Sequence, residues 1–172
     1  MFCFCIYDQE NRLLFLARDY FGIKPLYYFK KEDRILAFAS EIKSLLCHPE
    51  YKKEVNDEAI FNYLSFQYNP MDETVFKNIY KLRPAHFLKI DLTNNNIEEK
   101  RYWAFRFNQN DGMEEEQSKR ELLGKLQDSV AHHMVSDVPV GAFLSGGIDS
   151  GTIAALMQTI SGAKKISTFT VG

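Results

Sequence analysis

The sequence predicts two partial domains of different class: an α+β part rich in antiparallel strands, then an α/β part with a parallel sheet. Apolar runs separated by short polar turns fill residues 2–40, which is typical of antiparallel hairpins. Residues 108–112 are polar, contain glycine and lack periodicity, so they are expected to form a linker. A strand–loop–helix–strand pattern follows over residues 138–171 and favours a parallel βαβ unit. We therefore predict domains over residues 1–107 and 108–172.

In the first part, the strands are expected to pair as three antiparallel hairpins, because each apolar run is followed by a polar turn and a second apolar run. The expected strand pairs are 2–7 with 13–17, 26–29 with 35–39, and 85–90 with the stretch that returns from Ile97 toward Trp103. Cys3 and Cys5 are two residues apart, so they share one face of their strand.

Two helices are expected between these hairpins. Ser40 can cap a short helix over residues 41–47, which stops before Pro49. Asn56 can cap a second helix, whose first turn is acidic and which ends at Asn69 and Pro70. Its apolar stripe consists of Ile60, Phe61 and Leu64.

The second part begins with a long helix, whose first turn contains the acidic residues 114–116. Its apolar residues recur at helical spacing and are expected to face a core. They are Leu122, Leu123, Leu126, Val130 and Met134. A buried strand over 140–144, a loop, a helix that ends near Ile160, and a strand over 166–171 complete the expected order.

Composition limits the class of protein. The chain has 172 residues, 45% of them hydrophobic and 14% aromatic, which suffices for a packed core. A net charge of −2 gives no bulk attraction for nucleic acid or a membrane surface. No apolar run approaches the roughly 20 residues of a membrane span, and no signal peptide is visible, so a cytoplasmic location is expected. Three cysteines, Cys3, Cys5 and Cys47, do not suggest a disulfide framework or a metal site.

The most informative segment is the loop at residues 145–150, with the sequence Ser-Gly-Gly-Ile-Asp-Ser. Gly146 and Gly147 let backbone N–H groups approach an anion, and the helix that follows directs its positive end to the same place. Ser145 and Ser150 can add hydroxyl hydrogen bonds, and Asp149 can hold a magnesium ion. Because no Lys follows Gly147, this is not a Walker A loop, and it is not a dinucleotide fingerprint.

This loop resembles the pyrophosphate loop of the N-type ATP pyrophosphatases, and further segments are similar to glutamine-hydrolysing asparagine synthetases. Together they run from Met1 to Gly172 in the order of that family. The segments are residues 15–28 (Phe-Leu-Ala-Arg-Asp-Tyr-Phe-Gly-Ile-Lys-Pro-Leu-Tyr-Tyr), 38–46, 63–66, 74–77, 83–86 and 137–141.

The resemblance implies the end of an N-terminal-nucleophile (Ntn) hydrolase sandwich, the glutaminase, followed by the first βαβ unit of a parallel-sheet nucleotide-binding domain, the synthetase. It implies hydrolysis of glutamine, and attack of aspartate on ATP to give β-aspartyl-AMP and pyrophosphate. Ammonia then displaces AMP to give asparagine. ATP and Mg²⁺ are the implied cofactors, the partners are small molecules, and a homodimer is left open. By this resemblance ATP is bound by Leu144, Ser145, Gly146, Gly147, Asp149 and Ser150, with Mg²⁺ at Asp149.

The sequence departs from the family in two places. The family's glutaminase nucleophile is a cysteine at the first position of the mature chain, whereas here residue 2 is Phe2. Cys3 and Cys5 match an interior strand and are not that nucleophile, so no catalytic residue is assigned. Gly151 replaces the family's usual Ser. We expect an interior slice of the two domains that has neither activity as an isolated chain.

Two alternatives stay open. The first is a related ATP-dependent amidotransferase or a β-lactam synthetase, which shares the framework and differs in the acceptor pocket. The second is a non-catalytic remnant. Outside the loop, we expect a structural ion pair between Arg18 and Asp19, and solvated or capping roles for His132 and His133 near a helix end.

Overall fold

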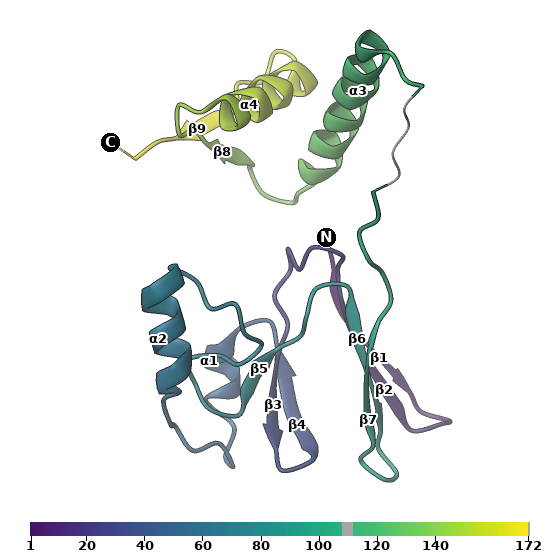
Figure 1. The fold of residues 1–172 in the computed structure, drawn as a ribbon, viewed down its shortest axis with the longest axis vertical. Helices are drawn as coiled ribbons and strands as arrows, with labels where there is room; N and C mark the ends of the chain where they lie inside the picture. Colours follow the sequence, from purple (N-terminus) through teal and green to yellow (C-terminus); the bar gives the residue numbers. More distant parts are fainter. Residues whose placement is uncertain (108–111, 172) are drawn as a thin grey trace. The chain divides into compact units, whose positions relative to one another are not determined.

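The computed structural model describes residues 1–107 and 112–171, and the predicted linker segment at 108–111 lies outside the described residues. The chain divides into two compact units, Met1–Phe107 and Asn108–Gly172 (Figure 1). The architecture is mixed α/β, and the sheets of the first unit are antiparallel. None of the helices in the described ranges combines the length and hydropathy needed to span a bilayer.

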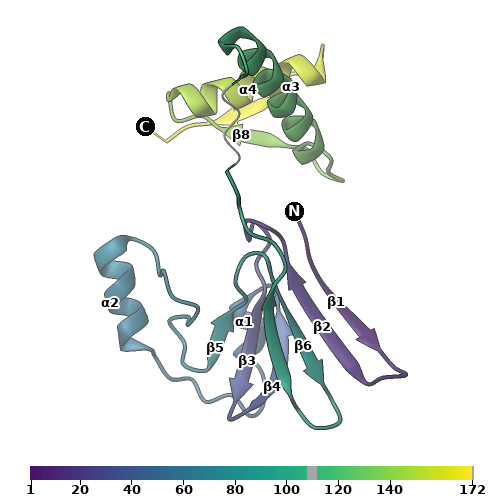
Figure 2. The same ribbon diagram turned by 45° about the vertical axis from the view of Figure 1, so that its right-hand side comes forward.

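The first unit contains a four-stranded sheet with the order β1-β2-β6-β7 (Figure 2). The strands β1 (Cys3–Asp8) and β2 (Leu13–Arg18) form one hairpin, and β6 (His86–Asp91) and β7 (Ile97–Arg101) form another. Both predicted hairpins are confirmed. The antiparallel pairing of β2 with β6 joins them, with Leu16 opposite Leu88.

A second sheet has the order β4-β3-β5. The predicted hairpin of β3 (Tyr27–Lys31) and β4 (Arg34–Ala39) is confirmed. The strand β5 (Ile79–Lys81) was not predicted, because three residues are too short to show an alternating pattern. It pairs with β3, and Ile79 is completely buried.

The core of this unit lies between the two sheets and beneath one helix. Side chains of the four-stranded sheet pack against those of the smaller sheet in one cluster, whose buried members are Leu16, Leu26, Leu82, Leu88 and Ile90. A second cluster, of Phe29, Leu45 and Ile79, lies between the smaller sheet and the helix α1 (Ile42–Leu45). The layers are therefore sheet, sheet and helix.

The predicted boundaries of α1 were wrong at both ends. The N-cap residue is Glu41, not Ser40, and its side chain makes no capping hydrogen bond. Ser40 lies one residue too early to reach the free amides of the first turn. Beyond Leu45, the backbone continues with tighter bonds to the third preceding residue, from Cys47 to Ser44 and from His48 to Leu45, so the α-helix does not extend to Cys47.

The helix α2 (Asp57–Phe66) begins as predicted. The Asn56 side chain accepts a hydrogen bond from the Ala59 amide at 3.3 Å. It ends earlier than expected, because Gln67 takes a left-handed conformation with φ of 62° and closes the last turn on the Tyr63 carbonyl. The end signal at Asn69 and Pro70 therefore marks the following loop.

The second unit consists of α3 (Glu115–His133), β8 (Gly141–Phe143), α4 (Ile148–Ser161) and β9 (Ser167–Phe169). The two strands pair in parallel. The two helices and the strands share a core around Val130, Leu156 and Met157, which Leu126 and Met134 join. Leu122 and Leu123 were expected in this core, but they are 60% and 48% exposed. They belong to the outer turns of α3, which no described element covers.

Candidate functional site

The loop at residues 145–150 connects the carboxyl end of β8 to the amino end of α4. The Leu144 amide donates to the Phe169 carbonyl at 2.7 Å and fixes the loop's start on the parallel pair. Gly141 permits the close approach of these strands, because a Cβ there would lie 2.8 Å from the Ser167 carbonyl oxygen. Gly147 is the N-cap of α4, and no side chain caps this helix.

Gly146 gives the loop its shape. Its φ of +78° is in the region that residues with a Cβ rarely adopt. A Cβ built on Gly146 would meet nothing within 4 Å, so the backbone here faces open space rather than another part of the unit. The glycine is therefore required by the backbone conformation and leaves room for a ligand.

The two serine hydroxyls tie the loop to the first turn of α4. Ser150 Oγ accepts from the Ser145 amide at 3.2 Å and donates to the Gly147 carbonyl at 3.2 Å. It also lies 2.9 Å from Ser145 Oγ, which accepts from the Gly147 amide at 3.4 Å. These bonds hold residues 145–147 in a compact turn against the helix.

Other amides of the loop have no partner. Those of Gly146, Ile148, Asp149 and Ser150 donate to no group in the described part of the chain. The last three are the free N–H groups of the first turn of a 14-residue helix, where the helix dipole adds positive potential. The arrangement suits an anion with several oxygen atoms.

Asp149 places a carboxylate beside these donors. It is exposed and belongs to the first turn of α4. A lone carboxylate repels an anion, so it suits the site only with a cation between them. The described residues contain no group of three or more His, Cys, Asp and Glu side chains that could hold a metal alone. Mg²⁺ needs no such group, because it commonly takes one or two carboxylates together with phosphate oxygens and water.

A separate hollow of about 520 Å³ lies in the same unit between α3, β8 and α4. Ser150 is the only predicted site residue that lines it, beside apolar side chains such as Val130, Ala142 and Met157. Gly146, Ile148 and Asp149 do not line this hollow, so three of the four free loop amides belong to residues outside it, whereas Ser150 borders it.

In the first unit, Arg18 and Asp19 are buried but do not form the predicted ion pair. Arg18 donates to the carbonyls of Lys24 and Leu82 at 2.8 and 2.6 Å and to that of Gly22. Burial is the largest cause that lowers the pKa of this guanidinium. Both side chains form hydrogen bonds with backbone groups instead of an ion pair with each other.

The Asp19 carboxylate accepts hydrogen bonds from four backbone amides at 2.9 to 3.2 Å. The donors are Phe2, Phe21, Ile23 and Lys24. Burial acts to raise the pKa of Asp19, but these hydrogen bonds outweigh it and leave the pKa below its ordinary value. Arg18 and Asp19 therefore organise the segment that carries the family-like run at residues 15–28.

Two protein-family models match the chain, one within each of its two units. A family model described as a glutamine amidotransferase domain matches residues 1–103, and one described as asparagine synthase matches residues 121–172. The chain belongs to the glutamine-hydrolysing asparagine synthetase family. It is 40% identical over its whole length to asparagine synthetase [glutamine-hydrolyzing] 1 of Bacillus subtilis, and 39% identical over 99% of its length to number 2 of that organism.

The family resemblance covers only part of each relative. The chain spans 26% and 24% of the two Bacillus subtilis proteins. It is also 32% identical, over 92% of its length, to amidase chyE of Penicillium rubens, of which it spans 23%. The recognition of the family from the sequence is thus confirmed.

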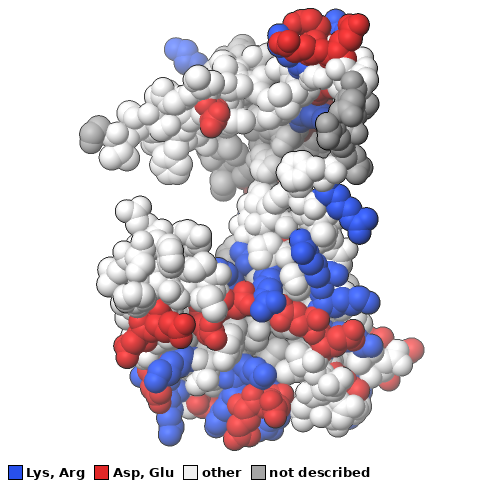
Figure 3. Space-filling model, viewed as in Figure 1, with Lys and Arg blue, Asp and Glu red and all other residues white. Residues whose placement is uncertain are grey.

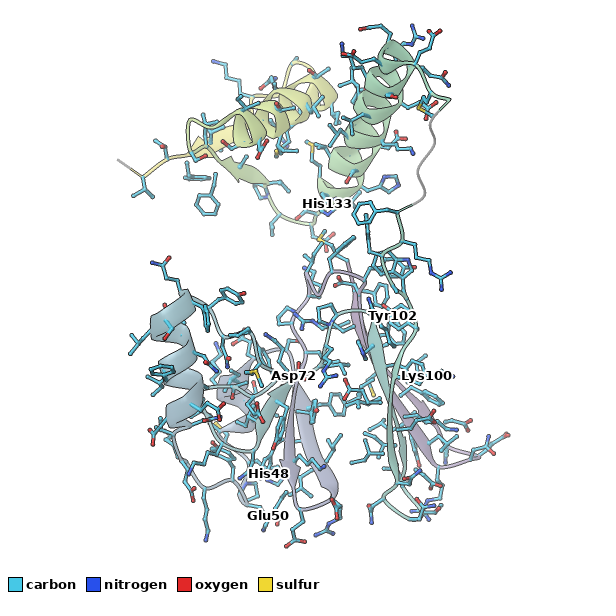
Figure 4. The ribbon with its side chains drawn as sticks, viewed as in Figure 1. His48, Glu50, Asp72, Lys100, Tyr102 and His133 are labelled. Carbon is cyan, nitrogen blue, oxygen red and sulfur yellow. The ribbon has the colours of Figure 1, made fainter. Side chains whose placement is uncertain are left out.

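The cysteines show no sign of a family nucleophile. Cys3, Cys5 and Cys47 are free thiols, and burial raises the pKa of Cys5, which keeps it protonated. His132 and His133 place their Nδ1 atoms 2.7 Å from the carbonyl oxygens of Asp128 and Ser129, four residues earlier in α3. Figure 4 labels His133 at the carboxyl end of this helix. Ile148 was not among the predicted binding residues although its amide is one of the free donors, because a backbone group leaves no trace in side-chain composition.

Proposed function

We propose that the protein which contains this chain makes asparagine from aspartate, glutamine and ATP. In this proposal the family's reaction runs through β-aspartyl-AMP, and residues 1–107 and 108–172 contribute to the glutaminase and synthetase domains. The observation that carries it is the set of four free amides at the amino end of α4, in the part of the chain that matches the asparagine synthase family.

The loop would bind the β- and γ-phosphates, which leave as pyrophosphate. Gly146, Ile148, Asp149 and Ser150 offer backbone N–H groups, and Ser145 offers a hydroxyl after rotation away from Ser150. Leu144, which is half-buried beside the loop, would contact the nucleotide. Charge builds on the leaving phosphates as aspartate attacks, and donors already aimed at that position lower the barrier.

Mg²⁺ fits this site through Asp149 together with phosphate oxygens, as argued above. When bound, it would neutralise charge on the departing pyrophosphate. The residues of the chain would hold the phosphates, orient the α-phosphorus and keep the loop closed on α4. We assign no residue among Cys3, Cys5 and Cys47 to glutamine hydrolysis.

The test is aspartate-dependent exchange of labelled pyrophosphate into ATP by the full-length protein, with ATP affinity measured in parallel. Gly146→Ala should weaken ATP binding by tenfold or more, because the added Cβ forces the loop out of its φ of +78°. Gly162→Ala is the matched control, since Gly162 also has positive φ, at +60°, and open space around it but lies at the other end of α4. Equal effects of the two changes would contradict the assignment of the loop.

A second candidate is a related ATP-dependent enzyme with another acceptor, such as another amidotransferase or a β-lactam synthetase. The relative named amidase chyE favours it, because a protein with a different name shares this stretch of sequence. Exchange of pyrophosphate into ATP that requires a carboxylate substrate other than aspartate would favour this candidate. Absence of exchange with tight ATP binding retained, or absence of both, would instead favour a non-catalytic remnant.

A further inference from the structure

A second hollow of the second unit lies at the amino end of its parallel strands, where β9 begins. Its volume is about 440 Å³, and ligand sites commonly occupy about 300–1,000 Å³. One wall is the segment 136–140, which leads into β8, and the other contains residues 164–167, which lead into β9. The loop at 145–150 follows the other end of these strands, because the Phe169 carbonyl that holds its start ends β9.

Hydrogen bonds within each wall fix its shape. In one wall, Gln158 donates from Nε2 to the Lys164 carbonyl at 3.3 Å, and its Oε1 accepts from the Ile166 amide at 3.2 Å. In the facing wall, the Val138 amide donates to Ser136 Oγ at 3.2 Å. Both walls are therefore ordered by their own contacts before any ligand is bound.

The charged side chains that line this hollow are two ammonium groups, of Lys164 and Lys165, and one carboxylate, of Asp137. We call it the lysine hollow. None of the three side chains forms an ion pair in the part of the chain that the structure describes. The acidic cluster over α3 in Figure 3 is the first turn of that helix, with Glu115 and Glu116, at the end away from the hollow. The hollow thus offers two positive charges and one negative charge to a ligand.

An acidic α-amino acid carries the complementary charges, namely two carboxylates and one ammonium group. Each carboxylate can face one lysine while the ammonium group faces Asp137, so every charge meets one of opposite sign. A dicarboxylate without an amino group leaves Asp137 without a partner, and a neutral amino acid leaves one lysine without one. The hydroxyl groups of Ser161 and Ser167, which also line the hollow, can add hydrogen bonds to carboxylate oxygens.

We propose that the lysine hollow binds an acidic α-amino acid, with its carboxylates toward Lys164 and Lys165 and its ammonium group toward Asp137. Val140 and Ile166, which pack on the core of the unit, line the hollow as well and can contact the methylene groups of the ligand. The three charged side chains are exposed, and exposed ion pairs are weak, so we expect a dissociation constant on the order of 1 mM. This proposal does not depend on ATP binding by the loop or on the identity of the acceptor.

The test is acetylation of lysines in the full-length protein that contains this chain, with the rate at each lysine measured by mass spectrometry. Saturating L-glutamate or L-aspartate should slow the reaction of Lys164 and Lys165 by about threefold or more, because ion-paired amines are less available. Lys125 is the matched control, since it is exposed on α3 and does not line the hollow. Its rate should not change. Because the rate is measured at single lysines, amino acids bound elsewhere do not alter the result, and Gly146→Ala should leave the protection intact.

The role of Asp137 is tested with glutarate, a dicarboxylate of the same length as glutamate that lacks the amino group. In the wild type, glutarate should protect the two lysines much less than glutamate does, whereas in Asp137→Asn it should protect them at least as well. Equal protection by both ligands in the wild type would overturn the proposal. Absence of protection by either amino acid, or equal protection of Lys125, would overturn it as well.

Discussion

The replacement Asp19→Asn tests the role of the buried carboxylate most directly. Asp19 is 3% exposed, and its two oxygens each accept two backbone amides. An Asn side chain keeps one oxygen and puts an N–H₂ group against the other two amides, so two hydrogen bonds to a charged acceptor are lost. With about 1.5–3 kcal/mol for each such bond, the free energy of unfolding of the first unit should fall by about 3–6 kcal/mol.

Urea unfolding at pH 7, followed by fluorescence, measures this loss. Trp103 is the only tryptophan of the chain, and its ring lies 5.0 Å from that of Tyr20, next to Asp19, so it reports on the first unit. The control is Asp8→Asn. The Asp8 carboxylate also accepts two hydrogen bonds, both from Asn11, but these bonds are exposed to solvent, so its replacement should change the midpoint little.

The dependence on pH gives the sign of the effect. The pKa of Asp19 is lowered in the folded chain, so its contribution to stability is complete above the unfolded value of about 3.9 and is lost as the pH falls through the folded value. The difference between wild type and Asp19→Asn should therefore shrink below about pH 4. A difference under 1 kcal/mol at pH 7, or one that grows toward pH 3, would refute the reasoning.

Three other substitutions should change stability in a stated direction, each measured by urea unfolding with Asp8→Asn as reference. Gly141→Ala should destabilise the second unit by about 1–3 kcal/mol, because the added Cβ would lie 2.8 Å from a backbone oxygen of β9. Unfolding of this unit is measured by circular dichroism. Gly151→Ala should stabilise that unit by about 0.5–1 kcal/mol, because Gly151 lies in α4 with open space around it and Ala has the higher helix propensity. Asn56→Ala should cost about 1 kcal/mol, because it removes the cap bond to Ala59; an unchanged midpoint would contradict that role.

The sequence predicted most strands of the first unit because their signal is local. An apolar run, a polar turn and a second run identify β1 with β2 wherever the sheet lies. The same signal cannot tell which faces are covered. Phe4 and Ile6 in β1 are 44% and 55% exposed, although their pattern is that of core residues. Burial depends on which other segments pack on the strand, and this information is not local.

Helices show the same limit. Spacing alone predicted α3 and its apolar positions, yet Val130 is buried and Leu122 exposed on the same helix. Only the turns of α3 that meet α4 find a partner within the described residues. For α2 the sequence predicted an apolar stripe but made no prediction of the direction in which it points, because a 3.6-residue period defines a face and not what covers it.

At the candidate site, the composition of the loop predicted which groups could bind an anion. It did not predict which hydrogen bonds those groups make when no anion is bound. A serine hydroxyl has one proton to donate. Ser150 gives its proton to the Gly147 carbonyl, so Ser145 must supply the proton shared between the two hydroxyls. Neither hydroxyl then has a proton left for a phosphate oxygen, while four amides are free. An arriving anion would therefore meet the backbone first, and the serines could join only after their bonds with the loop are exchanged. This order of events follows from hydrogen-bond counting in the folded loop, and the motif alone does not contain it.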